Sequence, residues 1–219
     1  MSAPAALVLA TAAAVAALLG FTWAGRPRAA GAAKLLASTG FLAFAWLLGA
    51  AHTPYGVAVL VALGLSWIGD AALIPTRSRG AFLLGLGAFL LGHVAYVAAF
   101  GLRPWAVSWL LAALPVLGAA AVLAWRWLSP HVEGGMRGPV AAYVGVISVM
   151  AVTALAATGG SGDVRIAAGA LAFYVSDLAV ARERFVASSP WNRTWGLPLY
   201  YGGQLLLASS VALRATTPG

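Results

Sequence analysis

The chain has 219 residues, of which 62% are hydrophobic and 8% charged, and a mean hydropathy of +0.92, values that exclude a water-soluble globular domain. Cysteine is absent, which excludes disulfides, thiol nucleophiles and thiolate metal sites. The net charge of +8 comes from Lys and Arg residues that lie singly between apolar runs, so we exclude a nucleic-acid partner. An integral membrane protein in the lipid bilayer is expected.

Apolar runs separated by Gly, Pro, Arg and Ser segments predict an all-α fold of about eight transmembrane helices, in a single transmembrane domain over residues 1–219. In chain order, the predicted spans cover residues 5–23, 32–50, 55–74, 81–101, 106–126, 139–158, 164–182 and 196–214. No Lys or Arg precedes the first run, so we expect an uncleaved first span and not a signal peptide.

Positive charges between the spans predict the orientation, because loops rich in Lys and Arg stay in the cytoplasm. One side of the predicted bundle carries Arg103, Arg165 and Arg214. The other side carries Arg26, Arg28, Lys34, Arg77, Arg79, Arg126, Arg137, Arg182, Arg184 and Arg193. Both termini should therefore face outside.

The two halves of the chain resemble each other in sequence. Residues 67–73 resemble residues 174–180, and the Asp in each segment is followed seven residues later by an Arg. Gly92-His93 in the fourth span corresponds to Gly203-Gln204 in the eighth. We expect two parallel four-helix repeats, with chance similarity among Ala- and Leu-rich helices as the alternative.

Five acidic residues occur, and only Asp70 and Asp177 lie inside predicted spans. Glu133, Asp163 and Glu183 lie at loops or helix ends, where we expect water to reach them. Asp70 and Asp177 are both about 7 Å from the cytoplasmic ends of their spans at about 1.5 Å per residue. Inserting an Asp into the membrane costs roughly 2.5–3.5 kcal/mol of free energy near the bilayer centre and less near its edge. Two Asp residues at the same depth therefore predict that both face one shared cavity near the cytoplasmic side.

Two neighbouring carboxyl groups in a low-dielectric cavity do not both ionise easily, so the pair offers one acid and one base. Two other interpretations stay open. In the first, each Asp is a structural partner of Lys34, an Arg or a hydroxyl. In the second, the pair serves ion or proton transport.

Further polar side chains at membrane depth are candidates for the cavity wall. His93 and Tyr96 belong to an aromatic stripe on the fourth span, and His93 and Gln204 either line the cavity or hydrogen-bond between helices. Lys34 either binds an anionic headgroup or snorkels to the membrane surface. The remaining candidates are Ser66, Tyr143, Ser148, Met150, Tyr174, Ser176, Tyr200 and Tyr201.

Sequence motifs argue against several other chemistries. The chain has no Gly-x-Ser-x-Gly, His-Glu-x-x-His, P-loop or Rossmann glycine pattern. His52, His93 and His131 are split between an outer loop, a span and an inner loop. We expect no metal and no cofactor.

An ordered set of motifs resembles the lysoplasmalogenase family of polytopic membrane enzymes, also called YhhN-like. The set covers the third, fourth, sixth, seventh and eighth spans, and the chain departs from the family at Lys34-Leu35, where the family often has Lys-Pro. The motifs are Ser66-Trp67-Ile68-Gly69-Asp70 through Leu73, Phe82, Gly85-Leu86-Gly87-Ala88-Phe89, His93 with Tyr96, Tyr143, Ser148 with Met150, Gly169-Ala170-Leu171-Ala172-Phe173, Ser176-Asp177, Phe185, and Tyr200-Tyr201-Gly202-Gly203-Gln204.

The resemblance implies an ether hydrolase that cleaves the vinyl ether bond of a membrane lysophospholipid, lysoplasmalogen, with Asp70 and Asp177 as its catalytic acids. The products would be a fatty aldehyde and glycerophosphoethanolamine or glycerophosphocholine. Independently, vinyl ether hydrolysis needs a proton donor, an anion beside the cationic intermediate and one water, which a carboxyl pair supplies. The alternatives are a proton-coupled transporter or lipid flippase that uses the same Asp pair, and a structural protein without turnover. Headgroup preference and oligomeric state stay open.

Overall fold

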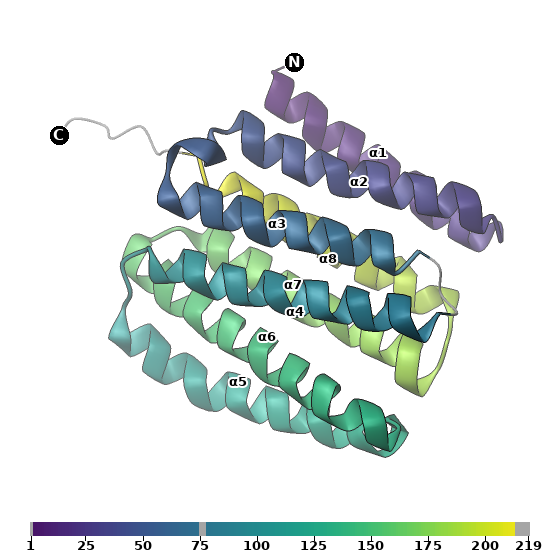
Figure 1. The fold of residues 1–219 in the computed structure, drawn as a ribbon. Coiled ribbons are helices and arrows are strands. Elements are labelled where there is room, and N and C mark those ends of the chain that lie inside the picture. The colour runs from purple at the N-terminus through teal and green to yellow at the C-terminus, as the bar shows by residue number, and fades with distance from the viewer. Residues whose placement is uncertain (1, 75–77, 213–219) are drawn as a thin grey trace.

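The computed structural model describes residues 2–74 and 78–212, and these residues form a bundle of eight α-helices without strands (Figure 1). The 3-10 turns η1 (Ala50–His52) and η2 (Ser129–His131) and the π-helical turn η3 (Arg182–Val186) connect helices. The α-helices are α1 (Ala3–Trp23), α2 (Pro27–Leu47), α3 (Pro54–Ala72), α4 (Arg79–Gly101), α5 (Val107–Leu128), α6 (Gly134–Ser161), α7 (Val164–Ala181) and α8 (Pro190–Ser209). The all-α prediction with eight helices is confirmed. Arg77, Arg214 and the end of the eighth predicted span lie outside the described residues.

Helices α2, α6 and α8 begin five or six residues before the predicted spans. Pro27 and Pro190 stand in the first turns of α2 and α8, where the missing N–H of proline costs no helical hydrogen bond. Polar residues in these turns interrupt the apolar run without interrupting the helix. Helix α3 ends at Ala72, so Asp70 lies two residues from its end, and the predicted equal depth of the two Asp does not follow from the helix ends.

Seven helical segments among the described residues are long and apolar enough to cross a membrane. Helix α8 is not among them, because Asn192, Arg193 and several other polar residues lower its hydropathy. It nevertheless packs against α7 and α2 within the bundle (Figure 1). Helices α1 and α5 lie at opposite edges of the bundle and bury the smallest shares of their residues. Their exposed apolar side chains are suited to contact with lipid.

Helix contacts in the two halves follow the predicted repeat. Helix α1 packs on α2 as α5 packs on α6, and α3 packs on α4 as α7 packs on α8. Between the halves, α2 contacts α8 as α6 contacts α4. Each of these contacts in one half therefore has an equivalent in the other half. Helix α3, which carries Asp70, is equivalent to helix α7, which carries Asp177.

Candidate active site

A cavity of about 600 Å³ lies between the two halves, and all eight helices contribute to its wall. Asp70 and Asp177 both line it. From Tyr143 and Tyr200 in the interior, the wall extends to exposed Arg184 and Arg193 at the end of the bundle where α3 and α7 end. We call this outer part, lined by residues 183–185 and 192–193, the mouth of the cavity.

Three side chains hold the carboxyl group of Asp70, which is 2% exposed. Lys34 Nζ lies 3.1 Å from Oδ1. Ser38 Oγ and the Tyr200 hydroxyl donate hydrogen bonds to Oδ2 at 2.6 and 2.7 Å. Tyr201 supports this arrangement, because its hydroxyl lies 3.1 Å from Ser38 Oγ and donates to the Lys34 carbonyl. One cation and two hydroxyl donors all stabilise the charged form of Asp70.

Asp177 has a different environment. The Tyr143 hydroxyl donates to its Oδ2 at 2.6 Å, and His93 Nε2 lies 3.8 Å from the same oxygen. Within residues 2–74 and 78–212, no Lys or Arg forms an ion pair with this carboxyl group. The two carboxyl groups therefore line the same cavity but have different kinds of partner.

One hydrogen bond of His93 determines which ring nitrogen carries the proton and which one faces Asp177 as an acceptor. Nδ1 lies 2.7 Å from the Phe89 carbonyl, which can only accept, so Nδ1 carries the proton of the neutral ring. Nε2 then presents a lone pair, and this buried atom has no hydrogen-bond partner in the described part of the chain. Phe173 packs on the ring with centroids 4.5 Å apart and holds it in place.

Seven of the candidate residues line the cavity, and seven do not. Those that line it are Lys34, Asp70, Tyr143, Tyr174, Ser176, Asp177 and Tyr200. Those that are buried outside the lining are Ser66, His93, Tyr96, Ser148, Met150, Tyr201 and Gln204. Tyr96 donates to Gln204 Oε1 at 2.6 Å, so this pair connects α4 to α8, and Ser66 donates to the Ala62 carbonyl within α3. Among the residues outside the lining, His93 approaches the Asp177 carboxyl group, and Tyr201 contacts two partners of Asp70.

Sequence reasoning missed Ser38 and treated Arg184 and Arg193 only as topology signals. Ser38 follows Lys34 by four residues, which places both on one face of α2, and this spacing could have indicated it. Arg184 follows Asp177 by seven residues, which in an uninterrupted α-helix would place both on one face, and this spacing could have indicated it. The position of Arg193 depends on how α8 packs against α7, and no local pattern indicates it.

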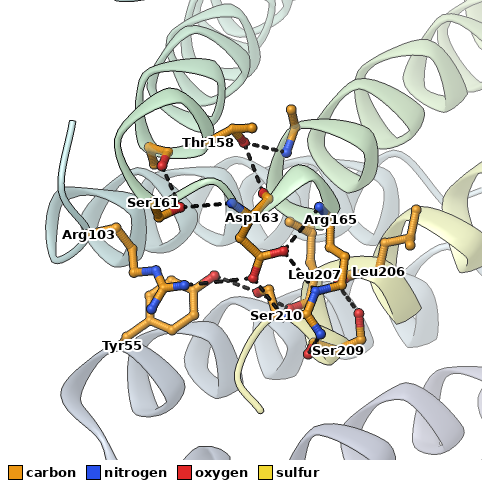
Figure 2. Close-up of polar contacts among 12 residues, drawn as sticks. Tyr55, Arg103, Thr158, Ser161, Asp163, Arg165, Leu206, Leu207, Ser209 and Ser210 are labelled. Atoms are coloured by element: carbon orange, nitrogen blue, oxygen red, sulfur yellow. Dashed lines mark hydrogen bonds and ion pairs between the residues drawn. The ribbon is translucent and has the colours of Figure 1, made fainter. Parts of the chain in front are cut away.

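A second polar cluster joins helix ends at the opposite end of the bundle, as Figure 2 shows. Asp163 forms ion pairs with Arg165 at 2.7 Å and with Arg103 at 3.7 Å, and Arg165 also donates to the Ser209 carbonyl. Asp163 is 1% exposed, so the expectation that water reaches it is wrong. The two arginines and the surrounding helix ends exclude solvent from this carboxylate.

These features define the class of the protein: a helical membrane bundle with two carboxyl groups on the wall of one cavity. Residues 29–211 match the YhhN family, and the chain belongs to this family. In the described segments, no group of three or more His, Asp or Glu residues is arranged to hold a metal ion.

Several relatives carry the name lysoplasmalogenase. The chain is 32% identical to Lysoplasmalogenase TMEM86A of Bos taurus over 163 residues, which cover 72% of this chain and 66% of the relative. It is 38% identical to Lysoplasmalogenase TMEM86B of Mus musculus over 153 residues, covering 70% and 62%. Lysoplasmalogenase of Mycobacterium bovis is 32% identical over 152 residues, covering 64% and 53%. The matches thus span less than two thirds of the length of these relatives. No solved structure matches the chain.

Proposed function

We propose that the protein is a lysoplasmalogenase, which hydrolyses the vinyl ether bond of lysoplasmenylethanolamine or lysoplasmenylcholine. The observation that carries the proposal is the pair Asp70 and Asp177 on the wall of one cavity, each with different partners. The family and the names of the relatives support the same activity.

The partners of the two carboxyl groups support a different role for each. Asp70, with Lys34 and two hydroxyl donors, is the anion of the pair. Asp177, which has no ion pair with Lys or Arg among the described residues, is the acid. A nearby negative charge on Asp70 favours retention of the proton on Asp177. The pair then holds one transferable proton beside one fixed negative charge.

In the proposed reaction, Asp177 transfers its proton to the outer alkene carbon of the substrate. The π electrons form the new C–H bond, and the adjacent carbon and the ether oxygen share the positive charge of an oxocarbenium ion. Asp70 stabilises this cation electrostatically, and water adds to the carbon as its proton passes to a carboxylate. In the resulting hemiacetal the carbon–oxygen bond to glycerol breaks, the glycerol oxygen takes up a proton, and the hemiacetal hydroxyl gives up its proton to form the carbonyl of the fatty aldehyde.

His93 is a positioning residue in this scheme. A protonated Asp177 has its acidic hydrogen near the Nε2 lone pair, at the 3.8 Å oxygen-to-nitrogen separation of the structure. A small movement of either group closes this distance to a hydrogen bond. We expect the contact to orient the proton between turnovers, while the Tyr143 hydroxyl donates to the same carboxyl oxygen and holds it in place.

The shape and chemistry of the cavity suit a single-chain lipid. Most of its wall is apolar, including Leu86, Leu128, Val140 and Ile147, whereas its mouth carries charged side chains. A lysolipid with its hydrocarbon chain against the apolar wall and its headgroup at the mouth brings the bond between them to the carboxyl pair.

Product analysis tests the proposal. Purified protein in detergent is incubated with lysoplasmenylethanolamine and, as controls, with the alkyl ether and acyl lysolipids of the same chain length. We expect aldehyde and glycerophosphoethanolamine from the vinyl ether alone. In deuterium oxide, the aldehyde should carry deuterium at the carbon beside the carbonyl. If folded protein releases no aldehyde and instead moves lipid across vesicles in response to a pH gradient, the protein is a transporter.

A further inference from the structure

We infer that Arg184 and Arg193, at the mouth of the cavity, form a binding subsite for the phosphodiester group of the substrate. This inference rests on the proposed function and extends it to headgroup recognition. Both arginines line the same cavity as Asp70 and Asp177.

Arg184 is held by an aromatic surface. Its guanidinium carbon lies 4.3 Å from the centroid of the Phe82 ring, and Phe185 packs edge-on against Phe82 with centroids 6.1 Å apart. Stacking on a ring face leaves the N–H edge of a guanidinium available for hydrogen bonds. Over the part of the chain that the structure describes, no carboxylate pairs with Arg184. The arginine is therefore oriented, and its donors are available to a ligand.

Arg193, in the first turn of α8, is oriented by Glu183. Its Nη2 lies 3.6 Å from Glu183 Oε1. Glu183 in turn accepts hydrogen bonds from Ser188 Oγ, the Ser189 N–H and Asn192 Nδ2 at 2.7–2.8 Å. With these partners Glu183 is fixed, and one ion pair uses only part of the five-donor guanidinium of Arg193.

The charged side chains of the cavity wall favour the mouth as the position of the substrate's phosphodiester group. Lys34, the other cation on the wall, is 3.1 Å from Asp70 and is already compensated. Because Lys34 and Asp70 neutralise each other, this ion pair offers no net positive charge to a phosphodiester deeper in the cavity. Arg184 and Arg193 are the remaining cations on the part of the wall that the structure describes, and a guanidinium fork matches a phosphate bidentately.

The spacing along the chain fits the substrate. Arg184 follows Asp177 by seven residues, four in α7 and three in the π-helical turn η3, so their backbones lie on the order of 10 Å apart along the helix axis. In a lysolipid the glycerol backbone separates the vinyl ether from the phosphate, so the two groups need recognition sites at separate depths. The carboxyl pair and the arginine pair provide two such depths, with the phosphate outermost.

A substrate without the phosphodiester tests the inference. Arg184→Gln, Arg193→Gln and the double variant are assayed with lysoplasmenylethanolamine and with the corresponding 1-O-alkenylglycerol, which has the same vinyl ether and chain. We expect KM for the phospholipid to rise at least tenfold in the double variant, with KM for the alkenylglycerol within twofold of wild type. Arg126→Gln is the control, because Arg126 is exposed near the same end of the bundle and does not line the cavity.

Equal changes for both substrates would overturn the inference, because they would indicate a general effect on the fold or on membrane lipid. Unchanged kinetics for both would overturn it as well. If the wild type cleaves neither substrate, the proposed function fails, and the subsite is tested by direct binding of the alkyl-ether lysolipid with and without its phosphodiester. The subsite then requires that the double variant lose affinity only for the ligand with the phosphodiester.

Discussion

Among the described residues, the hydrogen-bond and ion-pair partners of Asp70 come from α2 and α8, and each of them suits a negative charge. Asp177 receives a hydroxyl from α6 and faces an imidazole acceptor from α4. The same residue type on two equivalent helices thus has different neighbours, and the proposed division into an acid and a base depends on this difference. Replacing Lys34 and His93 tests the partner of each carboxyl group separately.

Removal of the cation beside Asp70 should expose the cost of a buried carboxylate. We expect Lys34→Met to lower the free energy of unfolding by about 3 kcal/mol, because breaking a buried ion pair leaves its partner uncompensated. Adding Asp70→Asn to Lys34→Met should recover part of this loss. Thermal unfolding in detergent measures all four proteins of the cycle, and strictly additive effects would show that the pair is not coupled.

Replacement of His93 should impair chemistry more than binding. For His93→Phe we expect kcat to fall about tenfold, equivalent to the loss of one hydrogen bond of about 1–1.5 kcal/mol, with KM within twofold of wild type. His93→Gln keeps a hydrogen-bond acceptor and should retain more kcat than His93→Phe. A rise in KM with unchanged kcat would instead assign His93 to substrate binding.

Helices α7 and α8 approach each other closely at Gly169 and Gly203. A Cβ added at Gly203 would lie 2.8 Å from the Gly169 carbonyl oxygen, which belongs to the backbone and cannot rotate away. Since α8 carries Tyr200 and α7 carries Asp177, this contact sets how far the two sides of the cavity lie apart. Small residues at helix crossings are the usual means of such close packing in membrane proteins.

Adjacent glycines in α8 allow a matched test of this packing. We expect Gly203→Ala to destabilise the protein by about 1–3 kcal/mol through overpacking. At Gly202 an added Cβ meets nothing within 4 Å, so Gly202→Ala should be neutral or stabilise the helix by up to about 1 kcal/mol. The midpoints of thermal unfolding in detergent compare the two. Equal midpoints would mean that the α7–α8 contact is loose.

For the molecule as a whole, the distribution of Lys and Arg predicts that both termini face outside and that the mouth of the cavity faces the cytoplasm. The chain has no cysteine, so single cysteines can report this orientation. Ser2→Cys should react with a membrane-impermeant maleimide on intact cells, and Arg137→Cys only after permeabilisation. The reverse pattern would place the mouth on the outer side.

The sequence was sufficient for the number and class of helices, because apolar runs and their breakers are local signals. It also indicated Asp70 and Asp177, because a carboxyl group inside an apolar span is costly wherever it lies. Helix starts such as Pro190 were missed, because helices continue through polar turns. Cross-helix partners such as Ser38 and the burial of Asp163 depend on which helices pack together, and a single sequence without homologues does not contain this information.

The most direct test of the account is aldehyde release from lysoplasmenylethanolamine by Asp70→Asn and Asp177→Asn, each shown to be folded by its unfolding transition. The account predicts that each variant loses kcat by about 10²- to 10⁴-fold, because the reaction loses its anion or its acid. Asp163→Asn, a buried Asp in the cluster at the other end of the bundle, should keep its turnover per folded molecule. Full activity in folded Asp70→Asn or Asp177→Asn would contradict the carboxyl-pair mechanism.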